Sequence, residues 1–216
     1  MRKEAPIKDL VVLMPDKNWE TTVKTLLDRR GKALKIRKLN YDRFVHVYRD
    51  SGIYHGSGDF LRPFQRSYQY ALVLLDQEWK GGPNDRCVIR QHIQEDLDLK
   101  GWKDRSAVIV VEPELEAWVW SDSPHVSQVL GWAQGDLLAQ LALLDFRRNA
   151  LGKPERPKEV LTSILRAVRK PPFSALFGEI ALKVSLDRCT DQSFLEFRAI
   201  LSTWFSSEVN EPRHPS

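Results

Sequence analysis

Three short, uninterrupted apolar segments constrain the fold of this chain more than any other feature. They are Leu10–Met14, Tyr70–Leu75 and Ser106–Val111. Each has the length of a strand but lacks the alternation of a strand with one solvated face, which indicates burial on both faces. Apolar residues at helical spacing follow each segment. The order of strand and helix therefore predicts a parallel sheet covered by helices.

We accordingly expect an α/β fold with an open, mainly parallel sheet of about four strands and a helical C-terminal part. The more polar segment Lys35–Leu39 is the expected fourth strand, nearer the sheet edge. Residues 40–58 lack periodicity and contain several glycines, which is typical of a functional surface loop. Asp59 is the expected cap of a short helix that ends near Tyr68.

The remainder of the chain indicates helices alone. The expected ranges are Pro124–Leu130, Gln134–Phe146, Pro157–Val168, Ser174–Leu186 and Asp191–Phe205. We therefore divide the chain into an α/β core over residues 8–124, a helical extension packed on it over 125–207, and a flexible tail over 208–216. With 216 residues, of which 42% are apolar, one sizeable core is expected.

Composition also limits location and redox chemistry. No apolar run approaches the ~18 residues of a membrane helix, and the N-terminus does not resemble a signal peptide, so we expect a cytoplasmic protein. Cys87 and Cys189 lack the spacing of a zinc site, and we interpret both as core thiols. Trp118 and Trp120 are expected in the core or at the wall of a site.

Acidic residues follow three of the four expected strands. Asp16 follows the first strand, Asp76 and Glu78 the third, and Glu112 the fourth. The carboxyl ends of parallel strands share one edge of the sheet, where α/β proteins bind ligands. Acids that gather there repel one another unless they are separated, protonated or neutralised by a cation. Because carboxylate oxygens suit Mg²⁺ or Mn²⁺, the pattern predicts a divalent-metal site.

The spacing of Asp76 and Glu78 makes this pair the strongest candidate. Side chains two residues apart share a face of a strand, so both could reach one ion if the strand continues through Gln77. The alternative is that the two acids serve only the turn and the cap that follow.

The other acids have structural alternatives as well. Asp16 or Glu112 could cap the next helix instead of serving a site. Glu114 and Glu116 lie in the expected first turn of a helix that begins at Pro113, where the helix dipole favours negative charge. A structural role is favoured for one of these two glutamates.

The basic residues suggest a polyanionic partner such as DNA or RNA. The net charge is +4 and the sequence pI is about 9.1. Lysines and arginines gather in residues 29–38, 147–158 and 166–170, although each group could simply be a solvated helix face. In the irregular segment, His46 or His55 could act as a general base or contact phosphate, or lie on an ordinary surface. The sequence contains no GxxxxGK[ST], GxSxG or HExxH motif, which argues against the usual P-loop NTPases, α/β-hydrolases and zinc proteases.

The strand, acidic loop and helix of residues 8–121, with an acid pair closing a hydrophobic strand, resemble a Toprim domain. That domain is the metal-binding module of topoisomerases, primases and several nucleases. The resemblance implies that Asp16 acts as a general acid or base and that Asp76 and Glu78 bind Mg²⁺. Toprim relatives carry Glu after the first strand, so Glu20, one turn later, is a second candidate there. Trp79 stands where a small residue is expected beside phosphate.

Several longer segments are similar to a narrower family. They are Arg49–Gly52, Phe60–Phe64, Ala71–Glu78, Glu112–Pro124, Leu130–Trp132, Lys153–Ser174 and Cys189–Phe194. They resemble an uncharacterised Toprim-like family of bacterial anti-phage defence loci, which includes the small component of methylation-associated defence systems. The long block around Glu114 is quite specific to that family.

The resemblance implies a component of such a system that acts on nucleic-acid phosphodiesters with Mg²⁺ or Mn²⁺. Glu112 or Glu116 would complete the metal cluster, and Glu112 is also a candidate catalytic acid beside Asp16 and Glu20. Other proteins of the same system are the implied partners. The alternative is a non-catalytic structural or regulatory subunit that binds a partner protein or nucleic acid.

Overall fold

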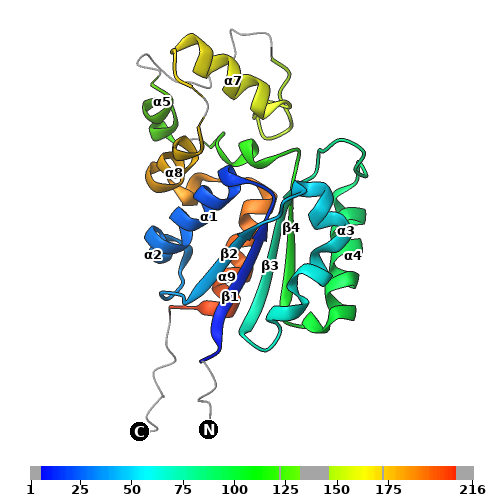
Figure 1. Cartoon of the computed structure of the whole chain (residues 1–216). Coiled ribbons are helices and arrows are strands. Elements are labelled where there is room, and N and C mark those ends of the chain that lie inside the picture. Colours follow the sequence, from blue (N-terminus) through cyan, green and yellow to red (C-terminus); the bar gives the residue numbers. More distant parts are fainter. Residues whose placement is uncertain (1–5, 122, 132–145, 172, 208–216) are drawn as a thin grey trace, which may run out of the picture.

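A four-stranded, all-parallel sheet forms the centre of the computed structural model, which describes residues 6–121, 123–131, 146–171 and 173–207. The strands are β1 (Lys8–Met14), β2 (Tyr41–Val45), β3 (Tyr68–Asp76) and β4 (Ser106–Val111), in the order β2-β1-β3-β4. All strands run towards the same edge, above which α5, α7 and α8 lie in Figure 1. The expected α/β class with a mainly parallel sheet is confirmed.

Helices connect the strands and form most of the C-terminal part. They are α1 (Lys17–Arg29), α2 (Gly31–Leu34), α3 (Arg49–Leu61), α4 (Arg86–Leu97), α5 (Pro124–Leu130), α7 (Pro157–Ala167), α8 (Ser174–Lys183) and α9 (Gln192–Phe205). Shorter helical turns are η1 (Arg62–Phe64), η2 (Asp98–Trp102), η3 (Leu115–Trp118) and η4 (Leu186–Arg188).

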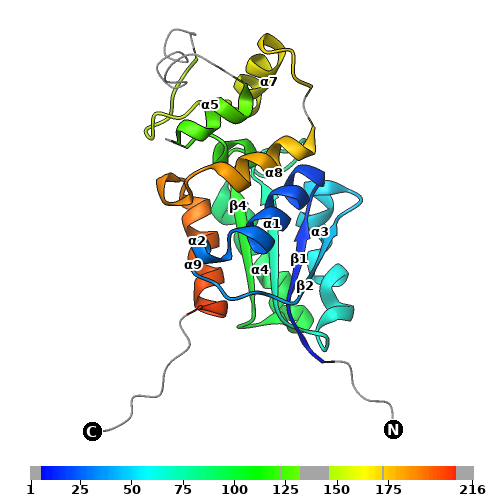
Figure 2. The same cartoon turned by 90° about the vertical axis from the view of Figure 1, so that its left-hand side faces the viewer.

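The sheet is buried on both faces, which explains the uninterrupted apolar runs. Leu10 and Val12 point to the face covered by α1 and α9, and Val11 and Leu13 point to the face covered by α3 and α4. Figures 1 and 2 show these helices on opposite sides of the strands. The alternation of side chains along each strand therefore supplies two apolar layers.

Helix α9 returns from the extension to the sheet. Its residues Phe197, Leu201 and Phe205 belong to the same apolar cluster as the β1 residue Leu10. The backbone N–H of Arg37 donates to the Phe205 carbonyl at 3.0 Å, which ties the end of α9 to the core. The extension therefore shares its apolar interior with the α/β core. Residues 208–216 and the predicted helix Gln134–Phe146, except for its last residue, lie outside the described residues.

Two sequence predictions between β1 and β3 are wrong. The segment expected to be a strand at Lys35–Leu39 is an irregular connection with one isolated bridge from Ile36 to Ser206, and the second strand is Tyr41–Val45, within the segment expected to be an irregular loop. Each residue of this edge strand is only partly buried, so it lacks the apolar run that marks its neighbours.

The rest of the expected loop forms most of α3. Its glycines permit close packing on α4, because a Cβ at Gly58 would lie 2.5 Å from Oδ2 of Asp96. Asp59 lies inside this helix and pairs with Lys100, so it caps no new helix.

The cysteines differ from one another. Cys87 is exposed, contrary to the core position expected for it, because α4 buries Ile89, Ile93 and Leu97 on its other face. Cys189 is buried, as are Trp118 and Trp120, which confirms their expected positions. Within the described residues, no helix combines the length and apolar character needed to cross a bilayer.

Candidate functional site

Five acidic side chains gather at the carboxyl ends of the four strands, and we call them the inner cluster. They are Asp16, Asp50, Asp76, Glu114 and Glu116. Asp16 follows β1, Asp50 opens α3 after β2, Asp76 ends β3, and the two glutamates follow β4. Every strand of the sheet therefore delivers at least one acid to this edge.

Asp76 is one of the two most buried acids of the inner cluster. Only 9% of the residue is exposed, and its Oδ1 accepts hydrogen bonds from the indole Nε1 of Trp19 at 3.0 Å and the backbone N–H of Leu115 at 2.9 Å. Burial and then the charges of Asp50 and Glu116 hold the pKa of Asp76 well above its ordinary value. This carboxyl group is thus fixed in place and favours a proton or a nearby cation.

Asp50 links the end of β2 to the end of β3. Its Oδ1 accepts a hydrogen bond from the backbone N–H of Asp76 at 2.9 Å. Burial, followed by the charge of Asp16, raises the pKa of Asp50. The preceding Arg49 has a φ of 50°, in the left-handed region that non-glycine residues rarely adopt. The sequence pattern does not mark Asp50 as a site residue, although the segment Arg49–Gly52 is among those that carry the family resemblance.

Asp16 caps α1 and also belongs to the inner cluster. Its Oδ1 accepts from the backbone N–H groups of Asn18 at 2.8 Å and Trp19 at 3.0 Å. The capping alternative is therefore realised. Its negative charge also contributes to the raised pKa values of Asp50 and Glu116, so capping does not remove it from the site.

Glu20, the alternative candidate on α1, has a different environment. It pairs with Lys17 at 2.6 Å and with Arg43 at 3.2 Å. The hydrogen bond from Lys17 is the main cause that lowers the pKa of Glu20. The structure thus gives Glu20 two cationic partners, whereas acids of the inner cluster face one another.

Glu116 is the second strongly buried acid. The helix expected after Pro113 is a single 3₁₀ turn, η3, and it places Glu116 with 5% of its surface exposed. Burial and then the charge of Glu114 raise the pKa of Glu116 to about 7. This group can therefore exchange a proton near neutral pH.

Lys158 brings a positive charge from the extension to the inner cluster. Its Nζ lies 3.1 Å from Oε2 of Glu114, and its backbone N–H donates to Oε1 of the same residue at 3.1 Å. Burial lowers the pKa of Lys158, but the charges of Glu116, Glu114 and Asp76 outweigh this effect and raise it. In the sequence, Lys158 is simply the last residue of the basic segment 147–158, and nothing in the pattern marks it as a site residue.

Glu78 and Glu112 lie elsewhere, in what we call the outer pocket. Both are exposed and line a pocket of about 520 Å³ together with Glu155, Asn84 and Leu151. Strand β3 ends at Asp76, and the chain bends at the next residue, so Asp76 and Glu78 do not share a strand face. The structure thus separates the predicted metal ligands into Asp76 and Glu116 on one side and Glu78 and Glu112 on the other.

The inner cluster suits a divalent cation in chemistry more than in spacing. Its carboxylate oxygens are ligands that Mg²⁺ and Mn²⁺ prefer. Burial, and after it the repulsion between the acids, raises the pKa values of Asp50, Asp76 and Glu116, so the charged forms are costly to hold there. Among the residues that the structure describes, however, no three acidic, histidine or cysteine side chains converge closely enough to hold one metal ion. Binding an ion through three acids would therefore require these side chains to move closer together.

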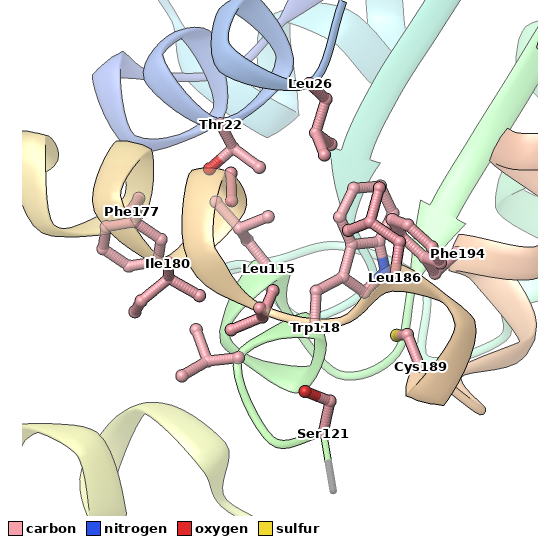
Figure 3. A pocket seen from close by; sticks show the side chains of 13 residues that line it. Thr22, Leu26, Leu115, Trp118, Ser121, Phe177, Ile180, Leu186, Cys189 and Phe194 are labelled. Atoms are coloured by element: carbon pink, nitrogen blue, oxygen red, sulfur yellow. The ribbon is translucent and has the colours of Figure 1, made fainter. Parts of the chain in front are cut away.

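A small apolar cavity of about 30 Å³ lies between the core and the extension. Figure 3 shows Leu26 of α1, Trp118 of η3 and Phe177 of α8 around it. The Trp118 indole N–H donates to Oγ of Ser193 at 2.7 Å. The residues that line the cavity are uncharged, so it forms part of the packing between the two regions and not of the acidic site.

Comparisons of this chain with protein-family models, curated proteins and solved structures found no match.

Proposed function

We propose that this protein is a Toprim-like, cytoplasmic component of a bacterial anti-phage defence system, and that its inner cluster binds Mg²⁺ or Mn²⁺ and cleaves nucleic-acid phosphodiesters. The observation that carries the proposal is the meeting of acids from all four strand ends, with raised pKa values at Asp50, Asp76 and Glu116. Perturbed acids at the carboxyl edge of a parallel sheet are typical of functional sites.

In this proposal Asp76 and Glu116 hold the ion, and Asp50 is added to them. A bound divalent ion supplies charge stabilisation at the phosphate and an activated water or alcohol. Glu78 and Glu112 line the outer pocket and Glu20 is paired with two cations, so the proposal gives these three residues no part in holding the ion.

Groups in and around the inner cluster also orient its acids and move protons. Trp19 and the Leu115 N–H fix one oxygen of Asp76, which leaves the orientation of this carboxyl group little freedom. Glu116, with a pKa of about 7, can donate or accept a proton at the pH of the cytoplasm. Asp16 is held by its capping hydrogen bonds and is the proposed acid–base group beside the phosphate.

One observation favours the second candidate function, a non-catalytic subunit that binds a partner protein or nucleic acid. In the described part of the chain, no three acids lie close enough together to hold one metal ion, and Lys158 already supplies a positive charge beside Glu114. The net charge of +4 supports a polyanionic ligand under either function. Other proteins of the same defence system are the proposed partners in both cases.

Nuclease assays separate the two functions. The purified protein, alone and with proteins encoded beside it, is incubated with DNA and with RNA in the presence of Mg²⁺ or Mn²⁺. We expect metal-dependent cleavage that Asp76→Asn reduces by about 100-fold or more, since even residues that only support metal ligands contribute ~10–100-fold to metal affinity. Glu78→Gln is the matched control and should retain activity. Absence of cleavage by the wild type in every combination would reject the enzyme and leave the binding subunit.

A further inference from the structure

Lys158 occupies the solvent edge of the inner cluster. It is the second residue of α7, and its side chain is 59% exposed while its ammonium lies 3.1 Å from Oε2 of Glu114. The start of α7 is held there separately, because the Trp120 indole N–H donates to the carbonyl of Pro157 at 3.2 Å. The ammonium can therefore leave the acids while α7 remains in place.

The charge of Lys158 acts on more than its direct partner. Glu116, Glu114 and Asp76 raise the pKa of Lys158 against the opposing effect of burial. In return, its positive charge lowers the pKa values that burial raises in Asp50 and Glu116. One ammonium from the extension thus offsets repulsion among acids that lie at the start of α3, at the end of β3 and after β4.

A divalent ion and this ammonium stabilise the same set of negative charges. Like charges that share a small, partly buried site repel each other, so the two cations cannot both gain their full attraction. The spacing of the acids favours the ammonium over the divalent ion. The Lys158 ammonium contacts a single carboxylate, that of Glu114, whereas no three acids of the described residues lie close enough together to share one metal ion.

We propose that Lys158 is a built-in counter-ion of the inner cluster, which competes with the divalent cation and thereby sets the metal affinity of the site. This inference rests on the proposed metal-binding function and assigns the extension a regulatory part in it. Any partner or substrate group that attracts the ammonium away from Glu114 would make the inner cluster a better metal site.

Titration calorimetry with MnCl₂ at pH 7.5 on the full chain tests this competition. Lys158→Met keeps the length of the side chain and removes its charge, and Lys158→Gln is a second variant that keeps polarity. Lys183→Met is the matched control, because Lys183 lies on α8 in an exposed pair with Glu179 at 3.9 Å. We expect both Lys158 variants to bind Mn²⁺ about tenfold more tightly than the wild type, and Lys183→Met to bind like the wild type.

The outcomes separate this inference from the proposed function. Equal or weaker Mn²⁺ binding by the Lys158 variants, with measurable binding by the wild type, would overturn the competition and leave the metal site standing. Binding by the Lys158 variants alone would support the competition in its strongest form. Failure of every variant and of the wild type to bind Mn²⁺ would reject both the metal site and the competition. Thermal unfolding of each variant confirms that it is folded.

Discussion

The inner cluster and the outer pocket contain the same kind of residue at the same edge of the sheet, yet they differ in almost every physical property. Asp76 and Glu116 are at least nine-tenths buried, whereas Glu78 and Glu112 are exposed. Asp76 accepts fixed hydrogen bonds, and burial followed by the charges of neighbouring acids raises the pKa values of Asp76 and Glu116. Proximity to a strand end therefore does not define a site by itself. Burial and mutual repulsion distinguish the acids that need a proton or a cation.

The largest predicted effect on stability concerns Glu116. Its pKa in the folded protein is about 7, above the ordinary value of 4.5, so folding favours the protonated form. This contribution is complete below about pH 4.5 and is lost as the pH rises through about 7. Urea unfolding should show a loss on the order of 3 kcal/mol over that range, which Glu116→Gln removes. Glu112→Gln is the control, and an equal effect of both variants would erase the distinction between the two regions.

A smaller effect is expected from the hydrogen bond that anchors Asp76. Trp19→Phe removes the indole N–H donor and leaves a small cavity, and we expect a loss of about 2 kcal/mol in the free energy of unfolding. Trp79→Phe, beside the outer pocket, should cost much less because Trp79 is only partly buried. Chemical denaturation measures both. Similar losses would show that the Trp19 hydrogen bond has no special weight.

Asp16 allows its two roles to be separated. Asn caps a helix as well as Asp does, so Asp16→Asn should preserve stability while it removes a charge from the inner cluster. Asp16→Ala removes the cap as well and should cost about 1 kcal/mol. Thermal unfolding checks the stabilities. If Asp16→Asn destabilised the protein as much as Asp16→Ala, the charge and not the cap would hold α1.

The smallest effects belong to the outer pocket. Glu78→Gln and Glu112→Gln alter exposed side chains that line the outer pocket, so each should change the free energy of unfolding by less than about 0.5 kcal/mol at any pH from 5 to 8. Urea unfolding of both variants beside the wild type provides the measurement. A change several times larger would mean that these glutamates share the energetics of the inner cluster.

The sequence predicted the parts of the fold whose burial is uniform. Strands β1, β3 and β4 are buried on both faces and appear as apolar runs, and the acids that follow them include Asp16, Asp76 and Glu116. Edge strand β2 is only partly buried, so its pattern gave no comparable signal and Asp50, which follows it, was not selected. Glu78 was selected because the bend at Gln77 leaves no mark in the pattern of residues. Lys158 reaches the site through tertiary packing of the extension, which local patterns do not reveal.

We propose that the inner cluster, and not the outer pocket, is the cation-binding part of this protein. Titration calorimetry with MnCl₂ tests it most directly on the wild type, on Asp76→Asn and on the double variant Glu78→Gln with Glu112→Gln. We predict that Asp76→Asn abolishes Mn²⁺ binding and that the double variant binds as the wild type does. Loss of binding in the double variant, with binding retained in Asp76→Asn, would contradict the claim.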